Sequence, residues 1–65
     1  MSQNLLTTKT LSERLNVGEQ TLRKWRLSGV GPAYIKLGDT KNAKVRYDLS
    51  DIQKWELENK FDPSL

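Results

Sequence analysis

The sequence predicts a small α+β domain, mostly α, in the order helix, turn, helix, two-stranded β-hairpin, third helix. Apolar residues recur at helical spacing in three short segments, and a β-prone segment with a polar centre lies before the third. The chain has 65 residues, which is the size of one domain. We therefore expect a single domain over residues 1–65 with an ordered core at about 5–59, after a disordered start over residues 1–6 that becomes anchored at Leu5 and Leu6.

The first helix is expected over about residues 8–15, where Leu11 and Leu15 repeat four positions apart. Thr7 stands before it, and a threonine hydroxyl at this position can accept a hydrogen bond from an unpaired amide of the first turn. Asn16-Val17-Gly18 then ends the helix, because asparagine tolerates left-handed backbone angles and glycine adopts them freely.

A second helix is expected over about residues 19–28. Leu22 and Trp25 lie three positions apart, so they can face inward together. The opposite arc of the helix carries Gln20, Arg23, Lys24 and Leu27. Ser28-Gly29 ends the helix, and Gly31-Pro32 imposes a turning or extended exit.

The segments at residues 33–37 and 44–47 predict the two strands of a hairpin, with a polar tip at residues 38–43. Alternation along the strands should turn Ile35, Leu37 and Val45 inward and turn the basic side chains outward.

Asp48 is expected to cap a third helix that runs to about Asn59. Its inward stripe is Leu49, Ile52 and Trp55, and Pro63 prevents any continuation. Both tryptophans fall on apolar helical stripes, so packing in the core is favoured over base stacking. The predicted core is Leu11, Leu15, Val17, Leu22, Trp25, Ile35, Leu37, Val45, Leu49, Ile52 and Trp55.

The composition argues against several classes of protein. The chain contains no cysteine and no histidine, which rules out disulfides and the usual zinc ligands and removes the commonest nucleophile and general base. We therefore expect no metal, no cofactor and no catalytic residue, and we predict that the protein is not an enzyme. The sequence contains no apolar run that could span a membrane. A cytoplasmic location and a monomer in solution are expected.

The charge of the chain is unevenly distributed. The net charge is +3 overall, but residues 1–47 carry +6 and residues 48–65 carry −3. A basic front suits a polyanion on one face, because binding of phosphates releases condensed counterions. An ordinary solvated surface explains the same charges, so the charge alone leaves both interpretations open.

A longer pattern joins these elements. Its parts are Leu6-Thr7-Thr8, Leu11 to Leu15, Val17-Gly18, Thr21-Leu22, Trp25, Ser28-Gly29, Gly31 to Gly38, and Arg46-Tyr47 followed by Asp48-Leu49. Together they resemble the MerR/excisionase-type small winged helix-turn-helix family, which includes phage excisionases and AlpA-like regulators. The resemblance covers about residues 5–57. Two features depart from it, namely Gly18 in place of a Ser or Thr and a longer wing tip at Asp39 to Ala43.

The resemblance implies that the second helix enters the major groove of double-stranded DNA and that the hairpin forms a wing over the backbone or minor groove. The expected recognition-helix contacts are Glu19, Gln20, Thr21, Arg23 and Lys24. The expected wing and backbone contacts are Lys36, Lys41, Lys44, Arg46, Tyr47, Thr7 and Thr8. For Lys41 a solvated loop lysine is an equal alternative, and Glu19 can instead complement the helix N-terminus.

The function implied is sequence-specific DNA binding. We predict an excisionase, a recombination directionality factor that binds and bends DNA to assist an integrase (a tyrosine recombinase) in excising a prophage or mobile element, with neighbouring copies on the DNA as further partners. The chain holds no sign of an effector domain or a long dimerisation helix, which favours this role. The alternative is an AlpA-like transcriptional regulator of prophage genes. A protein-interaction adaptor, docking through the acidic third helix and the tail from Phe61 to Leu65, is a third hypothesis.

Overall fold

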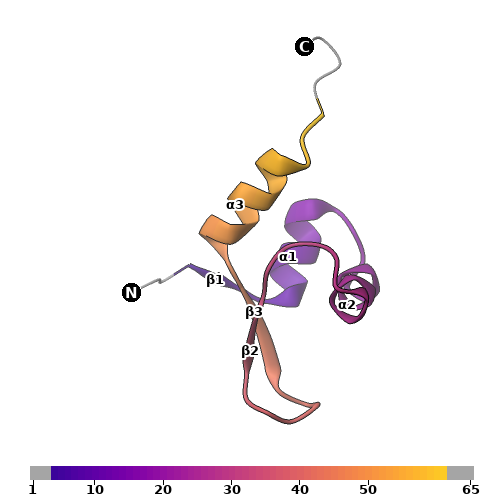
Figure 1. Ribbon diagram of the computed structural model, residues 1–65, viewed down its shortest axis with the longest axis vertical. Helices are drawn as coiled ribbons and strands as arrows, with labels where there is room; N and C mark the ends of the chain where they lie inside the picture. The colour runs from indigo at the N-terminus through magenta and orange to yellow at the C-terminus, as the bar shows by residue number, and fades with distance from the viewer. Residues whose placement is uncertain (1–3, 62–65) are drawn as a thin grey trace.

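The computed structural model describes residues 4–61, and within this range three helices accompany a small three-stranded antiparallel sheet. Figure 1 shows α1 and α2 beside the sheet and α3 extending from the end of β3. The elements are β1 (Leu5–Leu6), α1 (Thr8–Leu15), α2 (Glu19–Ser28), β2 (Ile35–Leu37), β3 (Lys44–Asp48) and α3 (Leu49–Glu58). The predicted fold class, a mostly helical α+β domain with a hairpin between the second and third helices, is confirmed. No helix of the described residues is long and apolar enough to cross a membrane.

The turn between α1 and α2 follows from two capping interactions. The Thr7 hydroxyl accepts a hydrogen bond of 3.1 Å from the amide of Thr10, as expected of an N-cap. At the other end of α1, Asn16 adopts a left-handed φ of 56°, and its amide donates to the carbonyl of Glu13. Gly18 has an ordinary φ of −72°, so Asn16 rather than the glycine makes the left-handed step.

The segment that follows α2 is shaped by two glycines. Gly29 ends the helix with φ 73°, and Gly31 has φ 87°. A Cβ built on Gly31 would lie 2.9 Å from Cε3 of Trp25. The chain therefore returns directly over the indole ring before it enters β2, and only glycine fits there.

The sheet has one more strand than the sequence predicted. Its order is β1-β3-β2, with Leu5 opposite Asp48 and Leu6 opposite Tyr47. The chain is anchored at Leu5 and Leu6 as expected, but the strand that they form was not predicted, and residues 1–3 lie outside the described residues. A strand of two residues is too short to show the alternation of apolar and polar residues that identifies strands, and its partner lies some forty positions further along the chain. No local pattern can reveal such a pairing.

The core is small. Leu11, Leu22, Tyr47 and Ile52 are fully buried, and Leu6, Leu15, Val17, Trp25 and Val45 pack against them. Leu49 and Trp55 are half-buried. The predicted inward positions are therefore largely correct on the helices.

On the hairpin two of the three predicted core residues are wrong. Ile35 and Leu37 are 38% and 52% exposed. In an antiparallel pair, residues directly opposite each other project from the same face, and Lys36 stands opposite Val45. Because Val45 faces the core, Lys36 shares its face, and Ile35 and Leu37 must project from the outer face. The sequence analysis recognised that side chains alternate along β2, but it assigned Ile35 and Leu37 to the inner face when they lie on the outer face.

The third helix is attached to the rest of the fold at both ends. Asp48 caps it as predicted, accepting a 2.9 Å hydrogen bond from the amide of Ser50. Further along, the guanidinium of Arg14 on α1 donates two hydrogen bonds, of 2.9 and 2.8 Å, to the carboxylate of Glu56. The rings of Trp25 and Trp55 meet at a centroid distance of 5.7 Å. The tail beyond Phe61, including Pro63, lies outside the described residues.

Candidate nucleic-acid interface

The outer face of α2 is polar and accessible. Gln20, Arg23, Lys24 and Leu27 are all exposed, as their positions on the helix predicted. On the opposite side Leu22 is buried among α1 and the core, which holds the helix in place. One face of the helix is thus packed against the domain, and the other presents side chains that can form hydrogen bonds. Helices of this kind enter the major groove of DNA.

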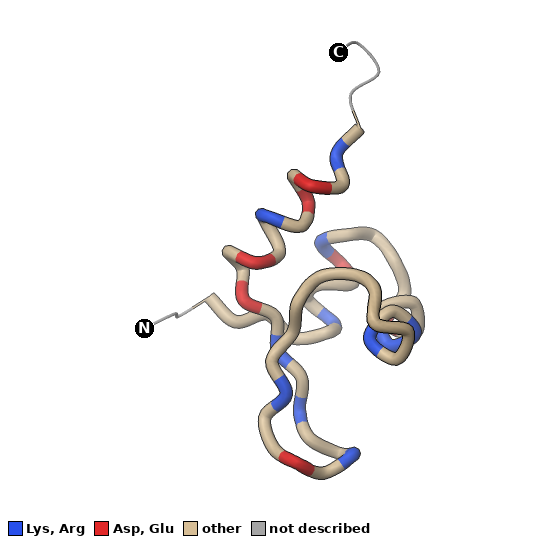
Figure 2. The backbone as a smooth tube through the Cα atoms, in the orientation of Figure 1, with Lys and Arg blue, Asp and Glu red and all other residues tan. Residues whose placement is uncertain are grey.

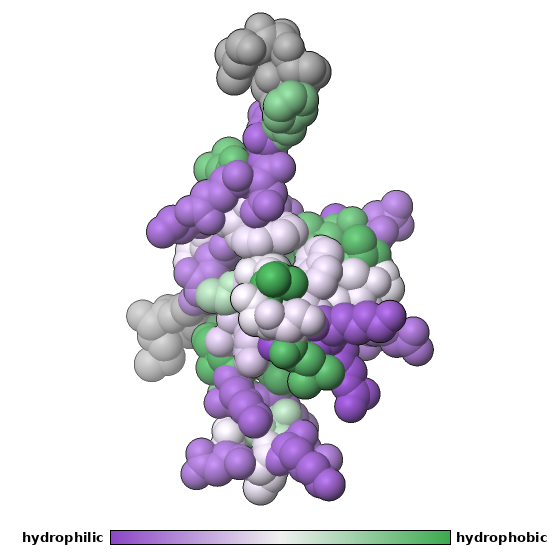
Figure 3. Space-filling model, turned by 45° about the vertical axis from the view of Figure 1, so that its right-hand side comes forward, coloured by the Kyte–Doolittle hydropathy of each residue, from purple (hydrophilic) through white to green (hydrophobic). Residues whose placement is uncertain are grey.

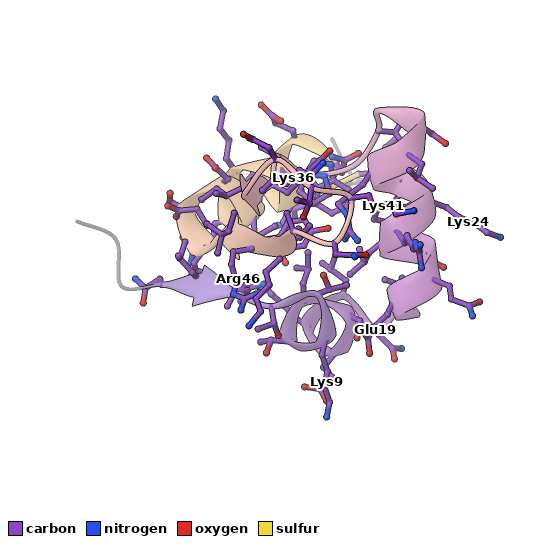
Figure 4. The ribbon with its side chains drawn as sticks, turned by 90° about the horizontal axis from the view of Figure 1, so that it is seen from below. Lys9, Glu19, Lys24, Lys36, Lys41 and Arg46 are labelled. Carbon is purple, nitrogen blue, oxygen red and sulfur yellow. The ribbon has the colours of Figure 1, made fainter. Side chains whose placement is uncertain are left out.

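The basic residues of the hairpin divide between its two faces. Lys36 projects beside Val45 from the face turned toward α2, whereas Lys44 and Arg46 share the outer face with Leu37 and Ile35. Figure 4 shows Lys36 and Lys41 on the side next to α2, Lys24 pointing away from the body, and Arg46 on the far side near β1.

A hollow of about 420 Å³ lies between α2 and the hairpin. We call it the α2–hairpin hollow. Its lining residues are Arg23, Arg26, Leu27, Tyr34, Lys36, Lys41, Ala43 and Val45. Four of these carry a positive charge and none a negative one, so the hollow is a concave cationic surface. Concave sites lined by one sign of charge concentrate counterions of the opposite sign.

Arg26 has a different environment from the other cations of the hollow. It is half-buried in the last turn of α2, and its Nη1 donates 2.7 Å to the hydroxyl of Tyr47 and 3.4 Å to that of Thr8. Its guanidinium carbon lies 5.9 Å from the centre of the Tyr34 ring. The sequence analysis missed this residue, although its place four positions after Leu22 puts it on the inward side of the helix.

Tyr47 does not lie on the surface. It is 1% exposed, its ring packs in the core 6.3 Å from that of Tyr34, and its hydroxyl accepts from Arg26. The prediction that Tyr47 contacts DNA is therefore wrong. Its position on β3 is two residues after Val45, which turns it to the same inner face.

The charges of the whole molecule separate along its long direction. Figure 2 shows basic residues on α2 and the hairpin, while acidic residues gather on α3 at the other end. In Figure 3 hydrophilic side chains surround the hairpin, with apolar side chains between them and the rest of the body. One end of the molecule is thus suited to a polyanion and the other is not.

Comparison with known families agrees with this geometry. Residues 5–60 match the profile of the helix-turn-helix domain, which is most of the chain. The chain belongs to the helix-turn-helix domain family. Neither the curated proteins nor the solved structures contain a match to it. A helix-turn-helix domain indicates sequence-specific binding of double-stranded DNA, and the family is typically without enzymatic activity.

The other residues predicted to contact DNA in this helix-turn-helix domain lie outside the α2–hairpin hollow. Glu19 is exposed in the first turn of α2, and Thr21 is half-buried next to it. Thr7 is engaged as the cap of α1, and the Thr8 hydroxyl accepts from Arg26. Arg46 is half-buried and donates to the carbonyl of Val45. Its remaining donors, together with the exposed ammonium of Lys44, are placed on the outer face.

Proposed function

We propose that this helix-turn-helix domain inserts α2 into the major groove and lays the β2–β3 hairpin across the adjoining backbone. The observation that carries this proposal is the α2–hairpin hollow with its four cations. A sugar-phosphate strand separates the major groove from the minor groove. A helix in one groove and a hairpin over the next must therefore straddle that strand, and the hollow between them is the place where it would pass.

The cations of the hollow then have the task of holding phosphates. Lys36 and Lys41 approach the hollow from the hairpin, and Arg23 approaches it from α2. Contacts of this kind fix register and orientation on the duplex without reading its sequence. Each phosphate neutralised lowers the logarithm of the binding constant by about 0.9 for each tenfold rise in salt.

Reading of the bases is assigned to the exposed residues of α2 outside the hollow. Gln20 can donate to and accept from adenine in the major groove, and Lys24 can donate to guanine. Each good bidentate contact contributes roughly 1–3 kcal/mol of discrimination. Gln20 has the chemistry for such a contact, so it is the leading candidate for specificity.

A salt titration on matched lysine pairs tests the mode of binding. A preferred duplex is first selected from a random pool, and binding is measured by fluorescence anisotropy between 50 and 200 mM salt, the range over which phosphate contacts change affinity by large factors. Lys36→Ala/Lys41→Ala should reduce the slope of the log–log plot by about 1.8, the value for two lost phosphates. Lys54→Ala/Lys60→Ala makes the same change of charge on or just after α3. An equal loss of slope in the control pair would contradict a strand in the hollow.

For the biological role we propose an excisionase, because the residue pattern from Leu6 to Leu49 resembles that of phage excisionases. Such a protein binds and bends DNA beside an integrase. Bending 20–30 base pairs costs on the order of 1–6 kcal/mol, which the combined contacts of helix and hairpin help to offset.

A reporter for recombination tests this role. An integrase and its attachment sites, chosen from those encoded beside the gene, are placed on a plasmid, with and without this protein. We expect the excised product only when the protein is present, and fluorescence energy transfer across the selected duplex should show bending. Excision at the same rate without the protein, together with altered transcription from a nearby promoter, would assign the protein to regulation instead.

A further inference from the structure

Arg26 connects the proposed recognition helix to α1, to β3 and to the segment that leads into β2. Its Nη1 donates to Thr8 in the first turn of α1 and to Tyr47 on β3, and the guanidinium plane lies near the ring of Tyr34, directly before β2. The 2.7 Å bond to Tyr47 is short and involves a charged donor, which makes it about twice as strong as a neutral one. The acceptor side is rigid, because Tyr47 is 1% exposed and packed in the core.

We propose that Arg26 is a positioning residue that sets the angle between α2 and the hairpin, so that both reach the same duplex at once. This inference rests on the proposed function. α2 packs on α1, and β3 packs on α1 in turn, so the helix and the hairpin are held together largely through a shared neighbour. Arg26 provides a direct link between them, at the end of α2 nearest β3.

The geometry favours an arginine at this position. A planar guanidinium can donate to oxygens on two different elements and lie against an aromatic ring at the same time. A lysine has the same charge but no planar fork, so it cannot reproduce this arrangement. The width of the α2–hairpin hollow depends on the link, because Arg26 and Tyr34 form part of its wall.

Direct contact of Arg26 with a phosphate is the competing interpretation, since Arg26 also lines the hollow. Tyr47→Phe separates the two. This substitution removes only the hydroxyl that accepts from Arg26, leaves every charge in place, and alters a residue that DNA cannot touch. A loss of DNA affinity in Tyr47→Phe can therefore arise only through the position of other groups.

The test uses Tyr47→Phe, Arg26→Lys and the double variant, at a temperature where circular dichroism shows all of them folded. Each single variant should bind the selected duplex on the order of tenfold more weakly, because α2 must be reoriented on binding. The salt slope should be unchanged, because every side chain that contacts phosphate is retained and reaches it in the complex. The double variant should be little weaker than either single one, since both remove the same bond. Residual dipolar couplings of the free protein should show a changed orientation of α2 relative to β3.

Arg14→Lys is the matched control. It makes the same substitution in an arginine that also links two elements, α1 and α3, but lies away from the hollow. It should lower thermal stability without changing affinity for DNA. Wild-type affinity in Tyr47→Phe, or an unchanged orientation of α2, would overturn the positioning role. A loss of about 0.9 in salt slope on Arg26→Gln, with Tyr47→Phe unaffected, would assign Arg26 to a phosphate.

Failure of the proposed function has a different signature. In that case the wild-type protein itself shows no salt-dependent binding to any duplex. The couplings of the free protein still report whether Arg26 sets the angle between α2 and β3.

Discussion

Arg14 and Glu56 join α1 to α3 by a bidentate pair on the surface of the molecule. The two hydrogen bonds from the guanidinium stabilise the ionised carboxylate and lower the pKa of Glu56 below its ordinary value of 4.5. The same pair raises the pKa of Arg14. A group whose pKa is lowered by folding stabilises the fold at pH values above its unfolded pKa, and this contribution is lost as the pH falls through the folded value.

Glu56→Gln should therefore lower the melting temperature at pH 7 and lose this effect at low pH. Above pH 4.5 the wild type has an ionised Glu56 paired with Arg14, and well below the folded pKa both proteins have a neutral side chain there. Thermal unfolding followed by circular dichroism at pH 7 and pH 2 measures the difference. Glu58→Gln makes the same change of charge on the same helix. A melting difference for Glu56→Gln that is equal at both pH values would contradict the role of the pair.

At this scale the sequence was informative where the helical period decides which way a side chain points. Leu11, Leu22 and Ile52 were expected to be buried and are. The sequence was less informative for side chains that combine an apolar stem or ring with a polar tip. Tyr47 was expected to contact DNA from the wing and Arg26 was left aside, but the half-buried Arg26 donates to the hydroxyl of the buried Tyr47. Such a pair brings together positions 26 and 47, and a single sequence contains no signal of which polar side chains will meet.

Among the elements, the connection from α2 to β2 is constrained at Gly31, which lies against the Trp25 ring. Gly31→Ala should destabilise the protein by more than 1 kcal/mol, because a side chain at φ 87° is strained and its Cβ would lie 2.9 Å from the Trp25 ring. Urea unfolding monitored by tryptophan fluorescence gives the free energy directly. A variant as stable as the wild type would show that the loop can take another path.

Gly18→Ser is predicted to act in the opposite direction. Gly18 caps α2 without a side-chain hydrogen bond, at an ordinary φ of −72°, and the nearest atom to a Cβ there is 4.0 Å away. A serine hydroxyl can accept from an amide of the first turn, which should raise the free energy of unfolding by a few tenths of a kcal/mol. The same urea experiment serves as the measurement, and a clear loss of stability would contradict the open space seen at Gly18.

The helices were predictable as elements because each has a cap, a period and a terminating residue close together in the sequence. α1 and α2 begin and end where Thr7, Gly18 and Gly29 suggested. The hairpin was located correctly, but its inward face depends on which strand contacts the core. β1 depends entirely on a distant partner, so it was missed.

For the whole molecule, the addition of β1 to the edge of the sheet matters most for stability. Leu6 packs against the core opposite Tyr47, while Leu5 is 43% exposed, and the carbonyl of Asn4 accepts from the amide of Leu49. A domain of fewer than 70–80 residues rarely has more than about 3–5 kcal/mol of stability from its core. The partial burial of a single leucine is therefore a substantial share of the total.

Leu6→Ala should lower the free energy of unfolding by about 1–2 kcal/mol, somewhat less than a fully buried leucine contributes. Leu5→Ala is its matched control on the other face of the same strand and should have a much smaller effect. Chemical denaturation of the two variants compares them. Equal losses would mean that β1 contributes through its backbone pairing and not through the packing of Leu6.

The pairing of β1 with β3 also has a consequence for biosynthesis. The first strand is made before any other element, but its partner spans Lys44–Asp48 and follows every element except α3. A ribosome adds about 5–20 residues each second, so Leu5 and Leu6 leave the exit tunnel seconds before the strand that will cover them. During that interval α1 and α2 can associate, but the sheet stays open at one edge. Completion of the sheet must therefore wait until β3 has been translated and has left the tunnel.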